Sequence, residues 1–310
     1  MQRIEIMVRT FRAILPVLDG EPDAIHNLIP AAVLELLTGQ GLLPKSLLSA
    51  SIGEQLRLLE TLLTGCVNDP SATSKLGQNL KAMRHAAFPL KKRLAVDTRR
   101  VPQLIEFDGS QPGRPFLSKR PASMQLRLDQ TITALSAFAG LLSDSTTRGH
   151  EWRFLDIGRR LEPALQTIER RRHGLGRNPV EPSHMDLVLL IADSSITYRS
   201  PYLTALRSNY VLELLLLDES NPRSIAFQLA ALVELTGKLP HQHSSSAWRL
   251  EKRLAHQPLS AVRVAHAPDL ISPRALEVFL NILLSDLHDL SEALTGRYLS
   301  HVMPSRLTAM

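Results

Sequence analysis

The sequence predicts an all-α protein, a multi-helix bundle of about ten helices. Leu occurs 57 times, almost twice as often as Val and Ile together, which occur 29 times. Unbranched side chains keep their rotamer freedom in a helix, whereas β-branched side chains lose it. The 310 residues include only 15 glycines, too few for a turn-rich sandwich or barrel. Apolar residues recur every three or four positions, and no alternating run of strand length occurs.

Stripes of apolar residues at helical spacing mark the individual helices. They predict helices over residues 4–18, 124–142, 154–168, 203–217 and 276–294. A further helix is predicted to run towards Gly237, with Asn221 as its N-cap and Pro222 in the first helical position. Ser272 and Pro273 are predicted to start the last helix in the same way.

Loops are predicted where proline and glycine gather, at 108–115, 174–182 and 240–246. None of them is long enough to be a flexible linker between domains. Residues 1–310 are therefore predicted to form one contiguous domain, with 108–115 as the candidate boundary between two lobes.

The overall composition excludes several classes of protein. No segment reaches the roughly 18 to 20 apolar residues that span a bilayer, so no membrane partner is expected. The single cysteine, Cys66, excludes an internal disulfide and a cysteine-ligated zinc site. It is typical of the reducing cytoplasm, which is the expected location. The net charge of +6 and the pI near 9.7 permit a nucleic-acid partner without requiring one.

Charged residues are densest in the predicted helix that begins after Arg148. Arg159 and Glu162 stand three positions apart, and Asp156 and Arg160 stand four apart, the spacings at which helix side chains meet. Several guanidinium groups beside two carboxylates could bind a carboxylate or a phosphate. The alternative is a helix flank held by salt bridges, each contributing a few tenths of a kcal/mol.

Two more polar clusters follow apolar runs, at 193–200 and at 218–224. The cluster at 193–200 is predicted to close a helix. Charged groups beside apolar stripes are tolerable only when they pair or bind a ligand. We therefore predict that one cleft with one surplus positive charge gathers Arg153, Arg159, Glu162, Asp193, Arg199, Asp218 and Arg223. Tyr198 and Glu219 complete the candidate ligand-binding residues.

Metal and nucleotide patterns are weak. Glu181 and His184 have ferritin-like spacing, but a second such motif is missing. His241 and His243 lack a third ligand. No P-loop, dinucleotide fingerprint or nucleophile elbow occurs, so no metal and no cofactor are expected.

The polar clusters together resemble the alpha-E domain family of bacteria. The matching stretches are 135–141, 152–162, 192–200, 214–224 and 298–301, and the resemblance covers the chain from about residue 3 to residue 303. It implies an all-helical domain named for a glutamate-arginine motif. It also implies a role beside ATP-grasp amide ligases and transglutaminase-like peptidases, with which such proteins are encoded or fused.

The chain departs from the family pattern at three places. The family's first helix opens with Gly-Arg-Tyr leading to Glu-Arg, whereas this chain starts at the equivalent of that pair with Gln2 and Arg3. We therefore expect a missing first turn, or a piece of a larger fusion. Pro163 replaces the usual arginine after the glutamate at 162, and Arg99 replaces a tryptophan.

Three functions remain open from the sequence. The resemblance favours a non-catalytic helical accessory or substrate-presenting component of an ATP-dependent peptide amide-ligase/peptidase system, which binds a peptide or an acidic small molecule. The second is a helical enzyme that acts on peptides through an Arg/Glu/Asp cleft. The third is a basic nucleic-acid-binding protein, which only the high pI favours.

Overall fold

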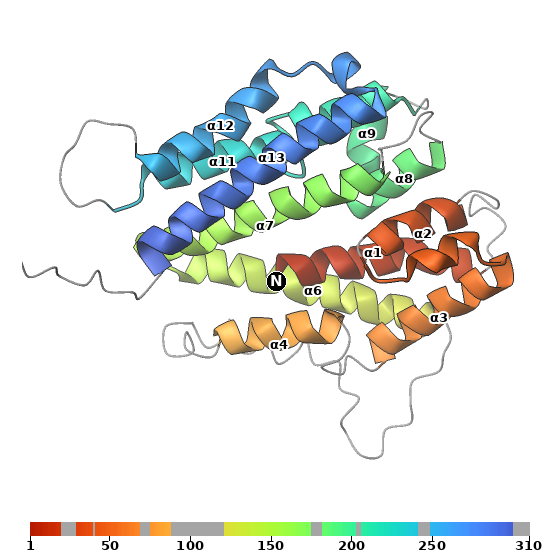
Figure 1. The fold of residues 1–310 in the computed structure, drawn as a ribbon. Helices are drawn as coiled ribbons and strands as arrows, with labels where there is room; N and C mark the ends of the chain where they lie inside the picture. The colour runs from red at the N-terminus through yellow and green to blue at the C-terminus, as the bar shows by residue number, and fades with distance from the viewer. Residues whose placement is uncertain are drawn as a thin grey trace, which may run out of the picture.

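The computed structural model describes residues 1–19, 29–39, 41–68, 75–87, 121–174, 182–202, 206–240 and 249–299. These residues form helices and connecting turns, and no strand occurs among them (Figure 1). The predicted all-α fold class is therefore confirmed. The candidate lobe boundary at 108–115 lies outside the described residues.

The helices follow one another along the chain with short turns between many of them. The N-terminal part contains α1 (Gln2–Asp19), α2 (Ile29–Gly39), the 3-10 helix η1 (Lys45–Ser49), α3 (Ile52–Asn68), α4 (Lys75–Ala87) and α6 (Pro121–Ser145). The middle part contains α7 (His150–Gly174), α8 (Pro182–Ile191), α9 (Ser195–Tyr202), α10 (Ser208–Leu212) and the π-helical η3 (Glu213–Leu217). The last part contains α11 (Ile225–Gly237), α12 (Leu250–Val264), the 3-10 helix η4 (Ala267–Leu270), α13 (Pro273–Leu294) and the π-helical η5 (Thr295–Leu299).

Two hydrophobic clusters hold the helices together. The first is built mainly from α1 to α4 and α6, and the second mainly from α7 and α9 to α13. α8 belongs to both, because Leu187 and Ile191 pack in the first cluster while Val188 and Leu189 pack in the second. α7 lies between α1 and α6 on one side and α11 and α13 on the other (Figure 1). Residues on α7 and α8 therefore lie at the junction of the two clusters.

The last long helix has the predicted start and the predicted buried stripe. Ser272 Oγ accepts the backbone N–H of Ala275 at 3.4 Å, and Pro273 occupies the first turn, where its missing N–H leaves no hydrogen bond unmade. The leucines of the stripe are all buried in the second cluster: Leu276, Leu280, Leu283, Leu287, Leu290 and Leu294.

Three sequence predictions about local structure are wrong. The helix predicted over 203–217 begins at Ser208 within the described residues, and its last turn is π-helical. The helix that runs to Gly237 starts with Ser224 as its N-cap, because Ser224 Oγ accepts the N–H of Phe227 at 3.0 Å. The cluster at 193–200 does not close a helix, since α8 ends at Ile191 and a new helix starts two residues after Asp193.

None of the helices in the described ranges has the length and apolar character that crossing a bilayer requires.

Candidate functional site

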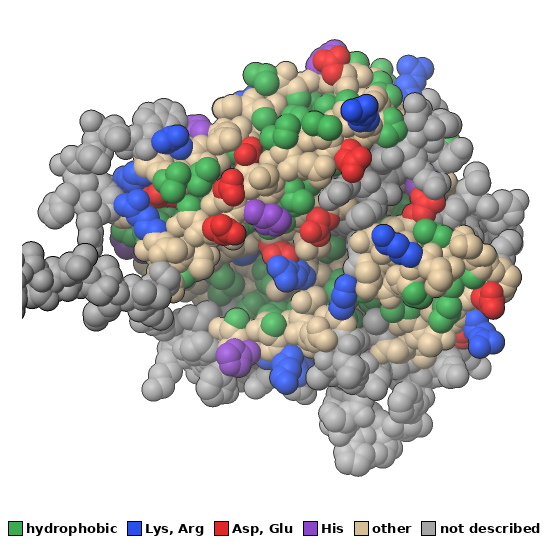
Figure 2. Space-filling model, in the orientation of Figure 1, with side chains coloured by type: hydrophobic (Ala, Val, Ile, Leu, Met, Phe, Trp, Pro, Cys, Tyr) green, Lys and Arg blue, Asp and Glu red, His purple; other side chains and the backbone are tan. Residues whose placement is uncertain are grey.

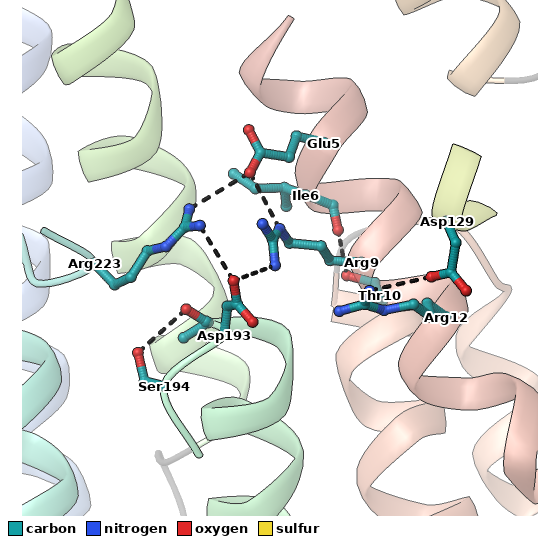
Figure 3. Close-up of polar contacts among 10 residues, drawn as sticks. Glu5, Ile6, Arg9, Thr10, Arg12, Asp129, Asp193, Ser194 and Arg223 are labelled. Atoms are coloured by element: carbon teal, nitrogen blue, oxygen red, sulfur yellow. Dashed lines mark hydrogen bonds and ion pairs between the residues drawn. The ribbon is translucent and has the colours of Figure 1, made fainter. Parts of the chain in front are cut away.

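Four charged side chains from three parts of the chain form a closed ring (Figure 3). Glu5 and Arg9 are one turn apart on α1, Asp193 lies in the turn between α8 and α9, and Arg223 lies in the loop before α11. Glu5 Oε1 lies 3.1 Å from Arg9 Nε and 3.5 Å from Arg223 Nη1. Asp193 Oδ2 lies 2.8 Å from Arg9 Nη1 and 3.3 Å from Arg223 Nη2. Each carboxylate pairs with both guanidinium groups, so the charges of this ring cancel.

The ring extends from the interior to the surface. The side chains of Arg9 and Glu5 are 8% and 14% exposed, whereas those of Arg223 and Asp193 are 42% and 50% exposed. A buried guanidinium is tolerable when carboxylates surround it with good geometry. Arg9 meets this condition, because it has a carboxylate partner from its own helix and another from the α8–α9 turn.

Asp193 is held in a strained backbone conformation at the end of α8. Its N–H donates to the carbonyl of Leu190 at 3.1 Å, and the next N–H, of Ser194, donates to the carbonyl of Leu189 at 2.9 Å. This is a Schellman motif, and Asp193 occupies its left-handed position with a φ of 56°. Glycine is usual there, and an acidic side chain is unfavourable beside the negative end of a helix dipole. Asp193 therefore carries two local costs, which its ion pairs in the ring offset.

The ring arginines also control the protonation of Asp193. Burial by itself raises the pKa of its carboxyl group, but the charge and hydrogen bond of Arg9, together with the charge of Arg223, outweigh that effect. The pKa of Asp193 is therefore below the ordinary aspartate value.

Arg223 is positioned by a loop whose polar groups are engaged. The π-helical turn directs the N–H of Asp218 to the carbonyl of Glu213 at 2.9 Å, which leaves the carbonyl of Leu214 for Asn221 Nδ2 at 2.8 Å. Asn221 Oδ1 accepts the N–H of Arg223 at 3.0 Å. Both ends of the Asn221 amide are thus occupied, which explains why this side chain does not cap α11. π-helical turns are frequent at functional sites. This one fixes Asn221, which lies two positions before Arg223.

A cavity of about 590 Å³ opens beside the ring, between α1, α6, α7, α8 and the start of α11. Its charged lining residues are four arginines and one glutamate: Arg9, Arg159, Arg160, Arg223 and Glu5. Its other polar lining residues include Gln2, Ser136, Thr167, Thr197, Asn221 and Gln228. Because the ring is neutral as a whole, any surplus positive charge in this cavity comes from the two arginines of α7.

These two arginines have different surroundings. Arg160 Nε lies 3.7 Å from a carboxylate oxygen of the buried Asp156, and its guanidinium lies 5.4 Å from the ring of Phe227. The Nε atoms of both arginines are buried and have no hydrogen-bond partner among the described residues, but Arg159 also has no ion pair among them. Burial lowers the pKa of Arg159, and the nearby charge of Asp156 offsets part of that shift. Arginine stays protonated in proteins, so Arg159 is a cation at the wall of an open cavity and has no ion pair among the described residues.

Glu162 does not pair with Arg159, although their spacing on α7 allows it. Instead, Arg3 of α1 binds both oxygens of Glu162, with Nη2 at 3.0 Å from Oε2 and Nε against Oε1. Gln166 Nε2 donates to the same carboxylate at 3.2 Å. Because Arg3 occupies Glu162, this carboxylate is not the partner of Arg159, which has no ion pair in the part of the chain that the structure describes.

Other residues predicted to converge on the cleft lie apart from the cavity. Arg153 donates to the carbonyl of Lys238 at 2.8 Å, at the C-terminal end of α11. Arg199 is exposed and lies 3.9 Å from a carboxylate oxygen of Asp186.

The remaining candidates also have their partners outside the cavity. Asp218 Oδ1 accepts the N–H of Ser220 at 2.8 Å, so it closes its own turn. Glu219 is exposed and accepts two hydrogen bonds from Arg263, at 2.6 and 2.9 Å. This pairing holds the pKa of Glu219 below its usual range. Tyr198 is buried, and its hydroxyl accepts the N–H of Arg207 at 3.0 Å.

The structure thus joins part of the predicted set and adds three residues to it. Arg159 and Arg223 line the cavity and Asp193 joins the ring, but Glu5, Arg9 and Arg160 were not among the candidates. Glu5 and Arg9 stand four positions apart on the first predicted helix, the spacing of a helical ion pair. That spacing is the signal by which the sequence could have revealed them.

The described residues contain no group of three or more His, Cys, Asp or Glu that could hold a metal ion. His184, one of the weak metal candidates, lies 3.4 Å from a carboxylate oxygen of Glu35 on α2.

Comparison with known proteins identifies the family. A family model described as a predicted alpha-helical domain with a conserved ER motif matches residues 1–299. The chain belongs to the Alpha-E family. Arg3, which the sequence resemblance leads us to expect at the arginine position of the family's motif, is the partner of Glu162 in this Alpha-E chain.

Three mycobacterial proteins are 26% identical to this Alpha-E chain over 245 residues. They are uncharacterized protein Rv2567 of Mycobacterium tuberculosis (strain ATCC 25618 / H37Rv), uncharacterized protein MT2643 of Mycobacterium tuberculosis (strain CDC 1551 / Oshkosh) and uncharacterized protein Mb2597 of Mycobacterium bovis (strain ATCC BAA-935 / AF2122/97). The match covers 75% of the chain and 27% of each relative, so the chain spans about a quarter of the relatives' length. No solved structure matches the Alpha-E chain significantly.

Asp193→Asn is expected to lower the free energy of unfolding at pH 7 by about 1–2 kcal/mol, because asparagine keeps the left-handed conformation but loses both charge-assisted contacts. The lowered pKa of Asp193 fixes the sign of the pH dependence. The carboxylate contributes stability above the ordinary aspartate pKa and loses it as the pH falls through the lower folded-state value. Urea unfolding from pH 7 to pH 2 should show the difference between the two proteins shrinking towards acid. A difference that does not shrink towards acid would contradict the ring's role.

The variants Arg159→Met and Arg9→Met test whether each arginine contributes to the free energy of unfolding. Arg9→Met should cost about 3 kcal/mol, since it leaves two carboxylates without their buried partner. Arg159→Met should change the free energy of unfolding by no more than about 1 kcal/mol, because an unpartnered buried cation carries a desolvation cost without an ion pair to lose. Denaturant unfolding of both variants measures this, and a large loss for Arg159→Met would mean that Arg159 is a structural residue.

Proposed function

We propose that the chain is a helical accessory component of an ATP-dependent peptide amide-ligase/peptidase system and that its cavity binds a carboxylate of the peptide or acidic small molecule handled there. Membership of the Alpha-E family supports the first half of this proposal. The observation that carries the second half is Arg159, a partly buried arginine at the wall of an open cavity whose Nε is buried without a hydrogen-bond partner among the described residues. A cytoplasmic location, expected from the single cysteine, fits such a system.

The chemistry of amide turnover explains why a carboxylate is the relevant ligand. An amide ligase consumes a carboxylate, and a peptidase releases one, so the group differs between the two sides of either reaction. A guanidinium fork binds a carboxylate through two parallel charge-assisted hydrogen bonds, which a neutral amide cannot match. A site built around Arg159 therefore distinguishes a free peptide end from a ligated one.

The carboxylates around the cavity favour binding over catalysis. Glu5 and Asp193 are engaged by the ring arginines, Glu162 by Arg3, and Asp156 by Arg160. A general base needs a carboxylate free to accept a proton from the substrate. Because these four carboxylates all have arginine partners, we assign the site to recognition.

Carboxylate binding can be measured by isothermal titration calorimetry with the tripeptide Ala-Ala-Phe and its C-terminal amide. The acid should bind at least about tenfold more tightly, the size of one charge-assisted interaction. Arg159→Gln should remove the preference. The control is Arg199→Gln, which changes an exposed arginine outside the cavity and should leave the preference intact. Equal binding of acid and amide by the unaltered chain would overturn the carboxylate assignment.

The accessory role is tested separately by native co-purification. The tagged full chain, expressed in a host that also produces the ATP-grasp ligase of the same organism, should retain the ligase on an affinity column at physiological salt. A matched tagged protein of similar pI controls for charge-driven retention. Failure to retain the ligase would overturn the accessory role and would not bear on carboxylate binding.

A further inference from the structure

A second hollow lies next to the cavity, and Arg159 lines both. It is a groove of about 510 Å³ between α4, α6, α7 and the start of α1. Gln2 and Arg159 line both hollows. Figure 2 shows a recess above α4 whose floor is formed by hydrophobic side chains, with charged side chains at its edge. Whatever binds Arg159 therefore has access to two environments.

The groove differs from the cavity in its chemistry. Its walls are mainly apolar and aromatic: Met83, Phe138, Leu142, Phe154 and Leu155. Its other charged side chains, Arg3 and Glu162, bind each other. The side chain of Arg159 has no ion pair among the described residues, and it lies where apolar and polar walls meet.

Gly158 leaves part of the groove open. It lies in the interior of α7, and a Cβ added there would have no heavy atom within 4 Å. A glycine in a helix interior costs about 0.5–1 kcal/mol relative to alanine. No contact in the described structure requires this glycine, but a side chain at this position would occupy the groove next to Arg159.

From these observations, and resting on the proposed function, we infer that the ligand is a peptide whose C-terminal residue carries a large apolar side chain. A ligand that uses both hollows must place its carboxylate and its apolar group close together beside Arg159, since this residue lines both. In a peptide, the C-terminal residue carries both groups on the same carbon atom, whereas an aspartate or glutamate side chain does not. The carboxylate binds Arg159, the side chain enters the groove, and the main chain continues into the polar cavity.

The polar cavity suits the main chain that this arrangement places there. Its walls carry the hydroxyl groups of Ser136 and Thr197, which can pair with amide groups of a peptide. An aromatic or long aliphatic side chain in the groove would be removed from water against Phe138 and Phe154, which is the main source of its binding energy.

Isothermal titration calorimetry with Ala-Ala-Phe, Ala-Ala-Gly and Ala-Ala-Phe amide tests this inference on the full chain. The unaltered chain should bind Ala-Ala-Phe about tenfold or more tightly than Ala-Ala-Gly, because burial of the aromatic ring adds to the carboxylate contact. Gly158→Phe should abolish this preference for Phe over Gly while it retains the preference for acid over amide. Gly140→Phe is the matched control, because Gly140 is also an exposed helical glycine with open space at its Cβ but lines neither hollow.

The outcomes separate the two proposals. Equal affinity for Ala-Ala-Phe and Ala-Ala-Gly, with acid still preferred over amide, overturns the apolar side-chain assignment and leaves the carboxylate site standing. Equal affinity for acid and amide overturns the carboxylate site itself. The comparison of peptides on the unaltered chain needs no variant, and circular dichroism with thermal unfolding shows whether Gly158→Phe folds. A folded Gly158→Phe that keeps the preference for Phe also overturns the groove assignment.

Discussion

The site depends on the ring of Glu5, Arg9, Asp193 and Arg223. It joins the first helix, the α8–α9 turn and the loop before α11, three segments that helix propensity alone leaves independent. Its alternating charges satisfy one another, so a guanidinium can be buried between the two hydrophobic clusters without a net charge. Since the ring is neutral and Arg160 has Asp156, the recognition properties of the cavity depend on Arg159.

Two residues of the site oppose the conformational preference of their local backbone. Asp193 places a carboxylate and a Cβ where a helix end favours glycine, and Gly158 places a glycine where a helix interior favours a side chain. Positions that oppose local preference are expected at functional sites, where binding geometry outweighs local stability. The two exchanges act differently, because Asp193 contributes a carboxylate to the ring and Gly158 leaves open space in the groove.

The fold could be predicted from the sequence because its helices carry long, regular apolar stripes and, in α13, a serine-proline start. One error arose because the Asn221 side chain could form either of two hydrogen bonds. Asn221 has a capping residue's chemistry, but the π-helical turn leaves the carbonyl of Leu214 unpaired, and that carbonyl takes the Asn221 amide. Only the three-dimensional arrangement reveals this competition.

Only part of the site could be predicted, because local sequence does not show which groups become partners in the folded chain. The sequence indicates that an arginine beside an apolar stripe needs a partner, but not which partner lies nearest. Arg153 meets a backbone carbonyl at the end of α11, and Arg199 meets Asp186 of the preceding helix. For Arg159 the adjacent Glu162 was the expected partner, and the contact of Glu162 with Arg3, 159 positions away in the sequence, is invisible to local spacing.

The separation of the ring's members along the chain also bears on how the protein folds. Arg223 and Glu5 are 218 positions apart, so their contact closes a loop that includes most of the chain. Contacts between residues this far apart in the sequence have a large loop-closure entropy cost, so they form after the local helices and the contacts between nearby residues. The cavity is therefore among the last parts of the molecule to be assembled, and a chain still emerging from the ribosome presents helices before it presents a binding site.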